Sequence, residues 1–376
     1  MIKRSPDNLL LSGDESMLYW IGKREVDISA SMDVFEYSIT YYGSNDKRNE
    51  ALVNSGVARK SNEYYTLLAS KMLEIAASDH LAKFIFYSNT VANRICALFP
   101  SLDEYVICRN SPSILKWLNN KTITRIWAAN YCPIPPCTVL AKEECDFATL
   151  RNCFPHYEEF ILQKNLSSGG NGTYYIDNSN AERIADELEC GSVYLASPCL
   201  PEIPSINSHV LITSKEVIVF APSRQRIDRI DDCLLFCGSF FCDESINQEL
   251  EESIYEQSKR IGKVLQKNGY RGVCGIDYLH DGGSALFLEI NPRFQGSSFL
   301  LDMTLKEKCG VSLFDLHMRS FTEHAESFER YETVRSCIGF ANYDMVDVAS
   351  DHSNCIYPFS RGEGQNYAIL RHRPSR

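Results

Sequence analysis

Residues 277–293 read DYLHDGGSALFLEINPR, and this stretch decides how the rest of the chain is interpreted. Two apolar segments flank a glycine-rich turn, a pattern that predicts a β-hairpin. Asp277 stands on the first strand, and Glu289 and Asn291 stand two residues apart on the second. Because alternate residues of a strand share one face, Glu289 and Asn291 are expected on the same side of the sheet.

The turn fixes which residues of the two strands face each other. A three-residue loop at 282–284 pairs His280 with Leu286 and brings Asp277 opposite Glu289. Two carboxylates and an amide oxygen then converge, and their repulsion is unfavourable in a half-buried sheet unless a cation neutralises it. Hard oxygen ligands of this kind suit Mg²⁺ or Mn²⁺ shared with the phosphates of a nucleotide. The alternative is a solvated strand edge with unrelated charges.

Arg293 follows on the same face, and Pro292 limits the strand before it. A planar guanidinium at this position can hold anionic phosphoryl or acyl-phosphate oxygens with two parallel hydrogen bonds. A second feature lies upstream, where a strand at Phe160–Lys164 runs into a glycine-rich loop. Its members, whose backbone N–H groups can wrap over phosphates, are Ser167, Ser168, Gly169, Gly170, Asn171 and Gly172. The loop lacks the lysine of a Walker A motif, and an ordinary turn between strands remains the alternative.

The remaining patterns predict alternating strands and helices. Further strands are expected at Phe35–Tyr42, Lys83–Ser88, Glu104–Cys108, Thr173–Ile176, His209–Thr213 and Val217–Ala221. Helices are expected at Asn62–Ser78, Ser113–Asn130, Ala181–Glu189 and Ser245–Asn268. The last of these has a capping box of Ser245 and Gln248 and a buried stripe of Ile246, Leu250, Ile254, Ile261 and Leu265.

Size and charge limit the classes of function. A chain of 376 residues suits two or three domains. Its net charge of −11 repels polyphosphate backbones, so nucleic acid is not expected as a partner. No apolar run approaches the ~18 residues needed to span a bilayer, and no secretory signal is present, so a cytoplasmic protein without a membrane partner is expected. The 15 cysteines are scattered without CxxC spacing and are expected to be reduced thiols.

Taken together, and in their order along the chain, these features resemble the ATP-grasp superfamily, which includes biotin carboxylase, carbamoyl phosphate synthetase and D-alanine–D-alanine ligase. The 12-residue step from Asp277 to Glu289 matches the metal-binding hairpin of that family. The resemblance implies an α/β (α+β) protein with an N-terminal Rossmann-like domain followed by a two-lobed ATP-grasp fold. The expected divisions are 1–112 for the first domain, 113–192 for the small lobe with the glycine-rich lid, and 193–376 for the large lobe with a C-terminal extension.

The resemblance also assigns roles to single residues. Lys121, which opens a helix before the turn at Pro133–Pro135, matches a lysine that contacts phosphates; a surface lysine is the alternative. The family has a lysine at the end of the strand before the lid, a position taken here by Gln163, with Lys164 one residue later. A slip of one residue reverses the face of a strand, so which of the two contacts phosphate stays open.

Three more positions come from the large lobe and the hinge between the lobes. Val193–Leu200, with Leu195 and Ser197, matches the hinge that receives adenine, and Asn207 lies on the strand that follows. Gln225 and Arg226 resemble a pair beside the phosphates, with Arg224 as a substitute for Arg226; surface basic residues are the alternative.

The implied activity is ligation. Mg²⁺ or Mn²⁺, in the form of two ions held by Asp277, Glu289 and Asn291, would support transfer of the γ-phosphoryl group of ATP to a small-molecule carboxylate. An amine of an amino acid or peptide would then displace phosphate, with Arg293 beside the reacting oxygens. The alternatives are acylation of a carrier-protein thiol, a nucleotide-binding protein that has lost catalysis, and an adaptor that uses its acidic surface. The oligomeric state stays open, and a homodimer is compatible with the sequence.

Overall fold

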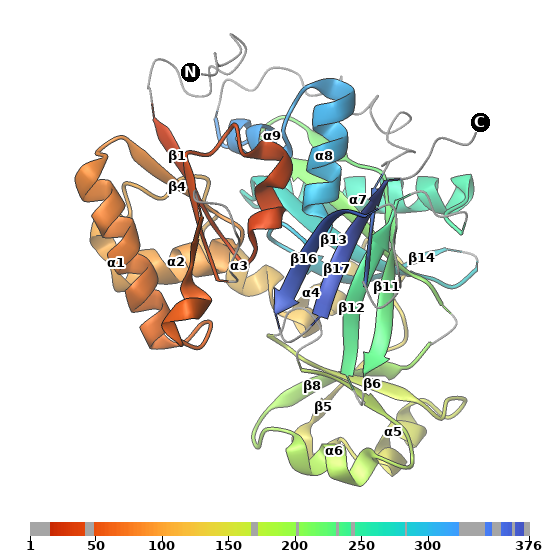
Figure 1. Cartoon of the computed structure of the whole chain (residues 1–376). Helices are drawn as coiled ribbons and strands as arrows, with labels where there is room; N and C mark the ends of the chain where they lie inside the picture. The colour runs from red at the N-terminus through yellow and green to blue at the C-terminus, as the bar shows by residue number, and fades with distance from the viewer. Residues whose placement is uncertain are drawn as a thin grey trace.

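The computed structural model describes residues 16–41, 49–166, 172–200, 203–230, 233–241, 245–282, 284–322, 343–347, 355–362 and 365–371. Figure 1 shows three parts: an N-terminal unit, a small lobe that carries β5, β6 and β8, and a large lobe that carries β11 to β14. The expected combination of a Rossmann-like unit with a two-lobed fold is confirmed. The ten cysteines whose side chains the structure describes are free thiols. In these same ranges, no helix is long and apolar enough to cross a membrane.

The N-terminal unit is a parallel sheet covered by helices. Its strands are β1 (Met17–Gly22), β2 (Tyr37–Thr40), β3 (Asn49–Ala51) and β4 (Ala82–Phe86), in the order β3-β2-β1-β4. Its longer helices are α1 (Asn62–Ser78) and α2 (Asn89–Leu98). The helix expected at Asn62–Ser78 is confirmed, and Ser61 caps it by accepting from the Tyr64 N–H at 3.1 Å. The strand expected at Glu104–Cys108 is wrong: the segment contributes only a bridge between Val106 and Phe84.

Two short helices, α3 (Pro112–Leu118) and α4 (Lys121–Ala128), connect this unit to the small lobe. A single helix over Ser113–Asn130 was expected, and that expectation is wrong. The chain leaves the helical conformation at Asn120, whose side chain accepts from the Ile123 N–H at 2.9 Å and caps α4. The N-cap makes Lys121 the first residue of α4, which determines where its side chain enters the molecule.

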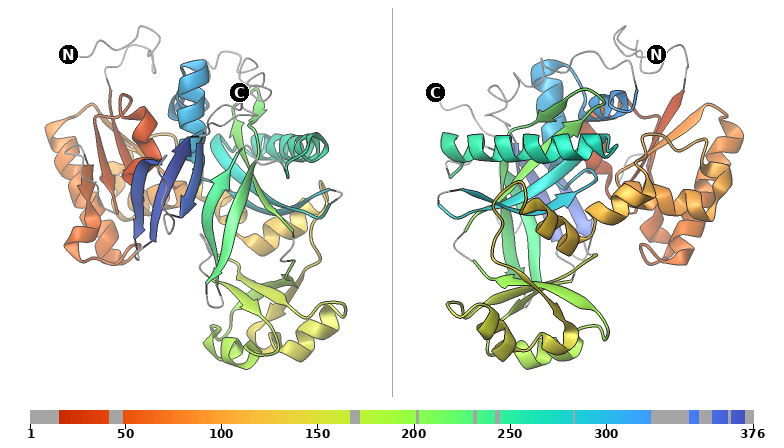
Figure 2. Two further views of the ribbon diagram at one scale, coloured as in Figure 1. Left: turned by 45° about the vertical axis from the view of Figure 1, so that its right-hand side comes forward. Right: turned by 180° about the vertical axis from the view of Figure 1, so that it is seen from behind.

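The small lobe is an antiparallel sheet with two helices. The elements are β5 (Thr138–Ala141), β6 (Phe160–Lys164), β7 (Thr173–Ile176), β8 (Val193–Pro198), α5 (Phe147–Cys153) and α6 (Ala181–Glu187). The strands lie in the order β7-β6-β8-β5. One face of the sheet buries Phe160, Leu162 and Tyr194 beneath the helices, and Figure 2 shows this lobe standing apart from the N-terminal unit.

The large lobe continues this sheet. Its strands β9 (Ser205–Ile212), β10 (Val217–Val219), β11 (Ser223–Ile230), β12 (Cys233–Phe240), β13 (Gly272–His280) and β14 (Ala285–Asn291) precede β15 (Tyr343–Asp347), β16 (Cys355–Gly362) and β17 (Gln365–Arg371). The order of the main path is β14-β13-β9-β11-β12, and β10 pairs with β9. The helices are α7 (Gln248–Lys267), α8 (Ser298–Cys309) and α9 (Leu313–Arg319).

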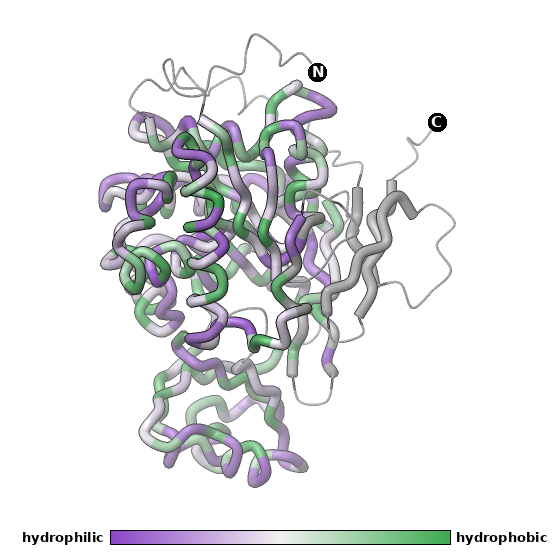
Figure 3. Tube along the Cα trace, turned by 60° about the vertical axis from the view of Figure 1, so that its left-hand side comes forward, coloured by the Kyte–Doolittle hydropathy of each residue, from purple (hydrophilic) through white to green (hydrophobic). Residues whose placement is uncertain are grey.

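Helix α7 covers one face of this sheet through the expected apolar stripe. Leu250, Ile254, Ile261 and Leu265 are buried and Ile246 is partly buried. Figure 3 shows the corresponding alternation of hydrophobic and hydrophilic residues along the helices. The expected Ser245–Gln248 capping box is wrong, because the Asn247 side chain accepts from the Leu250 N–H at 2.9 Å and begins the helix two residues later.

A cluster of aromatic side chains packs the N-terminal unit against the large lobe. Trp20 of β1 is fully buried, and its ring lies 5.6 Å from Phe294 and 5.0 Å from Phe314. Phe294 directly follows Arg293, so this packing joins β1 to the segment after β14. Edge-to-face aromatic pairs of this kind add about 0.5–1.5 kcal/mol each beyond the area they bury.

Candidate active site

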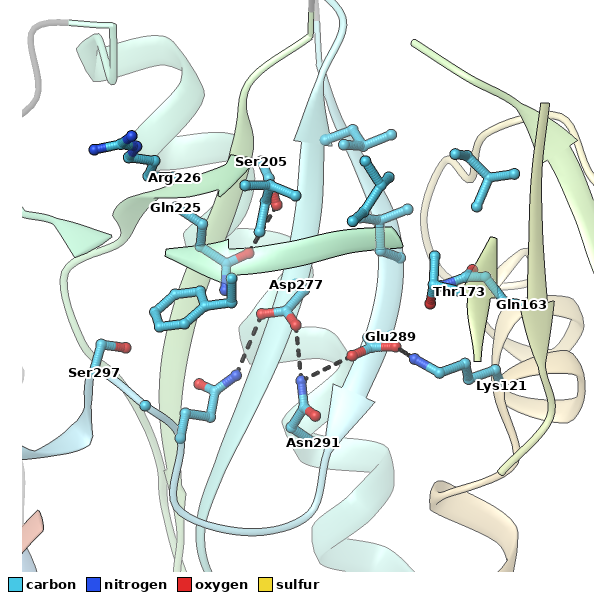
Figure 4. A pocket seen from close by; sticks show the side chains of 18 of the residues that line it. Lys121, Gln163, Thr173, Ser205, Gln225, Arg226, Asp277, Glu289, Asn291 and Ser297 are labelled. Atoms are coloured by element: carbon cyan, nitrogen blue, oxygen red, sulfur yellow. Dashed lines mark hydrogen bonds and ion pairs between the residues drawn. The ribbon is translucent and has the colours of Figure 1, made fainter. Parts of the chain in front are cut away.

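A cleft of about 1260 Å³ lies where the three parts of the molecule meet. The large lobe lines it with Asp277, Glu289, Asn291 and Arg293, and the small lobe contributes Gln163 and Ser197. Figure 4 shows Asp277, Glu289 and Asn291 converging, with Lys121 approaching from the opposite side. The sequence-predicted metal residues are therefore close together and face a space large enough for a nucleotide.

The hairpin of β13 and β14, called the carboxylate hairpin below, pairs as expected at the end that carries Asp277 and Glu289. Asp277 of β13 and Glu289 of β14 are cross-strand partners. Asn291 joins them, because its Nδ2 atom donates to Asp277 Oδ2 at 2.8 Å and to Glu289 Oε1 at 3.3 Å. The amide thus occupies the place between two anionic groups that would otherwise repel each other.

Nearer the turn, the expected register is wrong by one residue. His280 pairs with Ala285 rather than Leu286, because a β-bulge at Leu288 shifts the ladder before it reaches Asp277. The bulge has a specific partner: Arg125 of α4, which is 1% exposed, donates from Nε to the Leu288 carbonyl oxygen at 2.5 Å. The extra residue in the bulge compensates for the shifted register near the turn, so Asp277 still pairs with Glu289.

Asp277 is 8% exposed and is surrounded by amide groups. Asn207 donates to its Oδ1 atom at 2.6 Å, and Gln295 donates to the same atom at 3.3 Å. Gln295 reaches it only because Gly275 has no side chain: a Cβ there would lie 1.7 Å from the Gln295 amide oxygen. Burial raises the pKa of Asp277, while the Asn207 hydrogen bond and the charge of Arg293 oppose that rise.

Lys121 forms an ion pair with Glu289. The lysine is 7% exposed, and its backbone N–H donates to the Asn165 carbonyl oxygen at 3.0 Å. Burial and the nearby charges of Arg125 and Arg293 lower its pKa to about 7, against the attraction of Asp277. The Lys121 side chain lines the cleft and reaches the Glu289 carboxylate.

Arg293 is held at the other end of the hairpin. Its guanidinium donates to Asn291 Oδ1 at 2.9 Å and to the Phe294 carbonyl oxygen at 3.0 Å, and it lies 5.9 Å from the centre of the Tyr87 ring. Its backbone forms a bridge with Ser88 of the N-terminal unit. Arg293 is thus fixed from two parts of the chain while it still lines the cleft.

The two candidates at the end of β6 separate clearly. Gln163 lines the cleft, whereas the Lys164 ammonium lies 2.7 Å from Glu189 Oε1 and is not among the cleft-lining residues of the described chain. Of the lid residues, only Gly172 lies within the described ranges; it has φ +73° and accepts from the Lys164 N–H at 2.8 Å. Ser167, Ser168, Gly169, Gly170 and Asn171 lie outside the described residues.

The remaining predicted positions divide in the same way. Ser197 lines the cleft, whereas Leu195 is 1% exposed within the small lobe and does not line it. Arg224, Gln225 and Arg226 all line the cleft. Gln225 accepts from the Ser205 hydroxyl at 2.7 Å, and Figure 4 shows the Arg226 guanidinium pointing away from the carboxylates.

Several lining residues were not predicted from the sequence. Arg59, Lys60 and Tyr87 come from the N-terminal unit, and Gln295 comes from the segment after β14. None belongs to a pattern that the chain displays locally. Arg125 was also missed, although its spacing of four from Lys121 places both on one face of α4 and was the available signal.

The family assignment follows from one comparison. Residues 118–297, which contain the hairpin and the strands β5 to β14, match the family model described as an ATP-grasp domain. This segment of the chain is similar to an ATP-grasp domain.

One curated relative is similar to part of the chain. A [butirosin acyl-carrier protein]–L-glutamate ligase of Niallia circulans is 26% identical over 183 residues, or 47% of this chain and 43% of that protein. The chain therefore spans less than half the length of this relative.

The overall fold is similar to that of solved structures along most of the chain. Carboxyaminoimidazole ribonucleotide synthase from Aspergillus clavatus complexed with ATP has a TM-score of 0.64 at 13% identity, covering 95% of this chain and 94% of that one. The biotin carboxylase domain of Hydrogenobacter thermophilus 2-oxoglutarate carboxylase has a TM-score of 0.59 at 14% identity, covering 88% and 73%. At these identities the likeness concerns the fold alone.

The donor set of the site is compatible with a hard divalent cation. Within the described ranges, no group of three or more His, Cys, Asp or Glu side chains could hold a metal, so such an ion would depend on two carboxylates plus amide oxygens. Beside Asp277, the buried Asn207 Oδ1 atom has no hydrogen-bond partner in the described residues and remains available as an acceptor. Carboxylate and amide oxygens are the ligands that Mg²⁺ prefers.

Proposed function

We propose that the protein uses MgATP to activate a substrate carboxylate as an acyl phosphate and couples it to an amine of an amino acid or peptide. The observation that carries this proposal is the cross-strand pair Asp277–Glu289, with Lys121 and Arg293 on either side of it in one cleft. Two carboxylates beside two cations match the opposite charges of a metal–phosphate group.

Asp277, Glu289 and Asn291 would hold Mg²⁺ or Mn²⁺, in the form of two ions. The bound metal would supply charge neutralisation on the phosphate oxygens of ATP. In the structure Lys121 supplies the positive charge at Glu289, and Asn291 supplies a donor to both carboxylates. These contacts keep the anionic pair stable, and they are also the contacts that have to rearrange when a cation binds.

The nucleotide is proposed to lie between the two lobes. Gln163 and Ser197 line the small-lobe side of the cleft, and Gln225 lines the large-lobe side. The lid at 167–172 would cover the phosphates from the end of β6. The divisions near residues 112 and 192 are part of the same proposal, because they separate the N-terminal unit, the lid-bearing lobe and the metal hairpin.

The proposed reaction has two steps, phosphoryl transfer and then acyl transfer. A carboxylate oxygen of the substrate attacks the γ-phosphorus of ATP, the bond to the β-phosphate oxygen breaks, and ADP leaves. The nitrogen of a neutral amine then attacks the acyl carbon, inorganic phosphate leaves, and the nitrogen loses a proton. Arg293, oriented by Asn291 and the Phe294 carbonyl oxygen, is placed to donate to the oxygens that gain charge in both steps.

Phosphate release tests this proposal. Wild type should release inorganic phosphate from ATP in the presence of a suitable carboxylate and amine, and Glu289→Gln should lower the rate by about 100-fold or more because a metal-bearing carboxylate is lost. ADP must be the other product; formation of AMP and pyrophosphate would exclude the mechanism. Tight ATP binding without turnover across a broad set of acids and amines would favour a nucleotide-binding protein that has lost catalysis.

A second candidate function differs only in the nucleophile. The Niallia circulans relative is named as a ligase that joins L-glutamate to an acyl-carrier protein, which favours transfer to a carrier-protein thiol. The thiolate sulfur would attack the same acyl phosphate and release phosphate. Intact-mass analysis of a phosphopantetheinyl carrier protein after incubation with ATP and amino acids separates the two: a mass increase supports the thiol, and free amide product supports the amine.

A further inference from the structure

The N-terminal unit places a second set of residues on the cleft at a position that favours ligand binding. In the strand order β3-β2-β1-β4, the chain leaves β1 toward one side and returns to its other side at β4. Ligands of open α/β sheets bind outside the carboxyl ends of the strands that flank such a reversal. Lys23 follows β1 and Tyr87 follows β4, and both line the cleft.

This edge of the N-terminal sheet lies directly against the end of the carboxylate hairpin. Ser88 forms a backbone bridge with Arg293, and the Phe294 N–H donates to the Tyr87 carbonyl oxygen at 3.3 Å. A substrate whose carboxylate lies at Arg293 therefore has the N-terminal edge as its next neighbour. The nucleotide side of the cleft lies in the other direction, toward β6 and β8.

Two cations stand on this edge. Arg59 is partly buried and Lys60 is exposed, both line the cleft, and neither has an ion-pair partner among the described residues. By contrast, Arg24, which also lines the cleft, donates to Asp27 at 3.0 Å. Arg59, Lys60 and Arg293 line the same cleft. Partial desolvation, together with the charges of Arg59 and Arg293, lowers the pKa of Lys60. Clustered like charges are unfavourable until an anion joins them.

The backbone of Lys60 supports the same conclusion. Its φ of +66° lies in the left-handed region, which costs a non-glycine residue about 1 kcal/mol. The chain as a whole carries a net charge of −11, so the local excess of cations runs against the composition. A strained backbone that holds a cation on a cleft is the kind of feature that clusters at ligand sites.

We propose that Arg59 and Lys60 bind a second anionic group of the substrate whose carboxylate is activated at Arg293, so that the substrate is an acid with two anionic ends. This inference rests on the proposed function and adds a substrate class to it. The shared chemistry is an oxyanion, either carboxylate or phosphate, held by a guanidinium and an ammonium group.

Matched probes test this inference by direct binding. Calorimetry with the full chain, in the presence of Mg²⁺ and ADP, should compare L-aspartate with L-asparagine, L-glutamate with L-glutamine, and O-phospho-L-serine with L-serine. Each pair differs only in the second anion, and the last pair separates phosphate from carboxylate. In at least one pair the anionic member should bind about 10-fold or more tightly, because hydrogen bonds to charged groups are worth at least that much.

Variants then locate the preference. Arg59→Gln and Lys60→Asn together should abolish it while leaving ADP binding unchanged; asparagine is chosen because it tolerates the left-handed backbone of Lys60. Lys116→Met, on the exposed face of α3, is the matched control and should leave the preference intact. Absence of preference in all three pairs, or an unchanged preference in the double variant, would overturn the inference. Phosphate release is measured separately, so a failure of ligase activity is distinguished from a failure of anion recognition.

Discussion

Lys121 and Glu289 form an ion pair whose side chains are only 9% and 20% exposed. Removing one member leaves the other charge without its ion-pair partner in a largely buried place, whereas removing both leaves neither charge. We therefore expect Lys121→Met and Glu289→Gln to be strongly coupled in their effects on the free energy of unfolding. The two single variants and the double variant make up one thermodynamic cycle.

The structure sets the size of this coupling. Breaking a buried pair by removal of one partner costs about 3–5 kcal/mol, while replacing both partners with neutral groups is close to neutral. Each remaining charge here has partial compensation: Asp277 attracts Lys121, and Asn291 donates to Glu289. Each single substitution should thus fall at the lower end, about 3 kcal/mol. The double variant should cost about 1 kcal/mol, giving a coupling of about 5 kcal/mol against the sum of the singles.

Urea denaturation of the full chain without Mg²⁺ or nucleotide measures all four free energies. The control cycle is Arg183→Met with Glu187→Gln on α6, an exposed pair at a spacing of four whose N–O distance is 2.8 Å. Its coupling should stay below about 0.5 kcal/mol, because exposed pairs are screened by solvent. If the Lys121 and Glu289 substitutions are additive within the same limit, the buried pair does not exist in solution and the arrangement of the site is wrong.

Three further outcomes are expected. Burial raises the pKa of Asp302 from 3.8 to about 6, so the folded state binds this proton more tightly than the unfolded state and stability falls as pH rises from about 4 to about 6. Relative to Asp302→Asn, wild type should lose up to about 3 kcal/mol of unfolding free energy across that window. Unfolding free energies of wild type and variant that change in parallel with pH would contradict this. Arg125→Met should keep the melting temperature within a few degrees of wild type, because removal of a buried charge offsets the lost hydrogen bond to the Leu288 carbonyl oxygen. The rate of phosphate release should nevertheless fall about 10-fold, because the bulge at Leu288 moves. Gln163→Lys should tighten ADP binding severalfold in calorimetry, because it restores a cation beside the proposed phosphate site; an unchanged affinity would exclude Gln163 from that site.

The carboxylate hairpin shows what the sequence was able to predict. A fixed spacing and strict alternation were sufficient to predict that Asp277 faces Glu289, because both properties are local. The register nearer the turn was not predictable in this way. It depends on a bulge at Leu288 whose carbonyl oxygen is bound by Arg125, a residue 163 positions away in the chain. A partner at that separation leaves no mark on the hairpin sequence.

The end of β6 shows how far a local rule can go. Alternation along the strand predicted that only one of Gln163 and Lys164 faces the cleft, and the structure selects Gln163. The selection itself came from outside the strand, because Glu189 on the segment after α6 pairs with Lys164. The break before Lys121 is different: Asn120 is a good N-cap residue, and the structure confirms the helix that the family resemblance opens at Lys121 in place of one helix over Ser113–Asn130.

The distribution of charge connects these observations. In a chain of net charge −11, the cleft concentrates Lys121 and Arg293 at the carboxylate hairpin and Arg59 and Lys60 at the N-terminal edge. The first pair is balanced by Asp277 and Glu289, so a cation that binds those carboxylates would release Lys121 toward the phosphates. The second pair has no such balance among the described residues. If the proposals above hold, one end of the cleft is arranged for a metal and a nucleotide, and the other lacks only the anion that its substrate would bring.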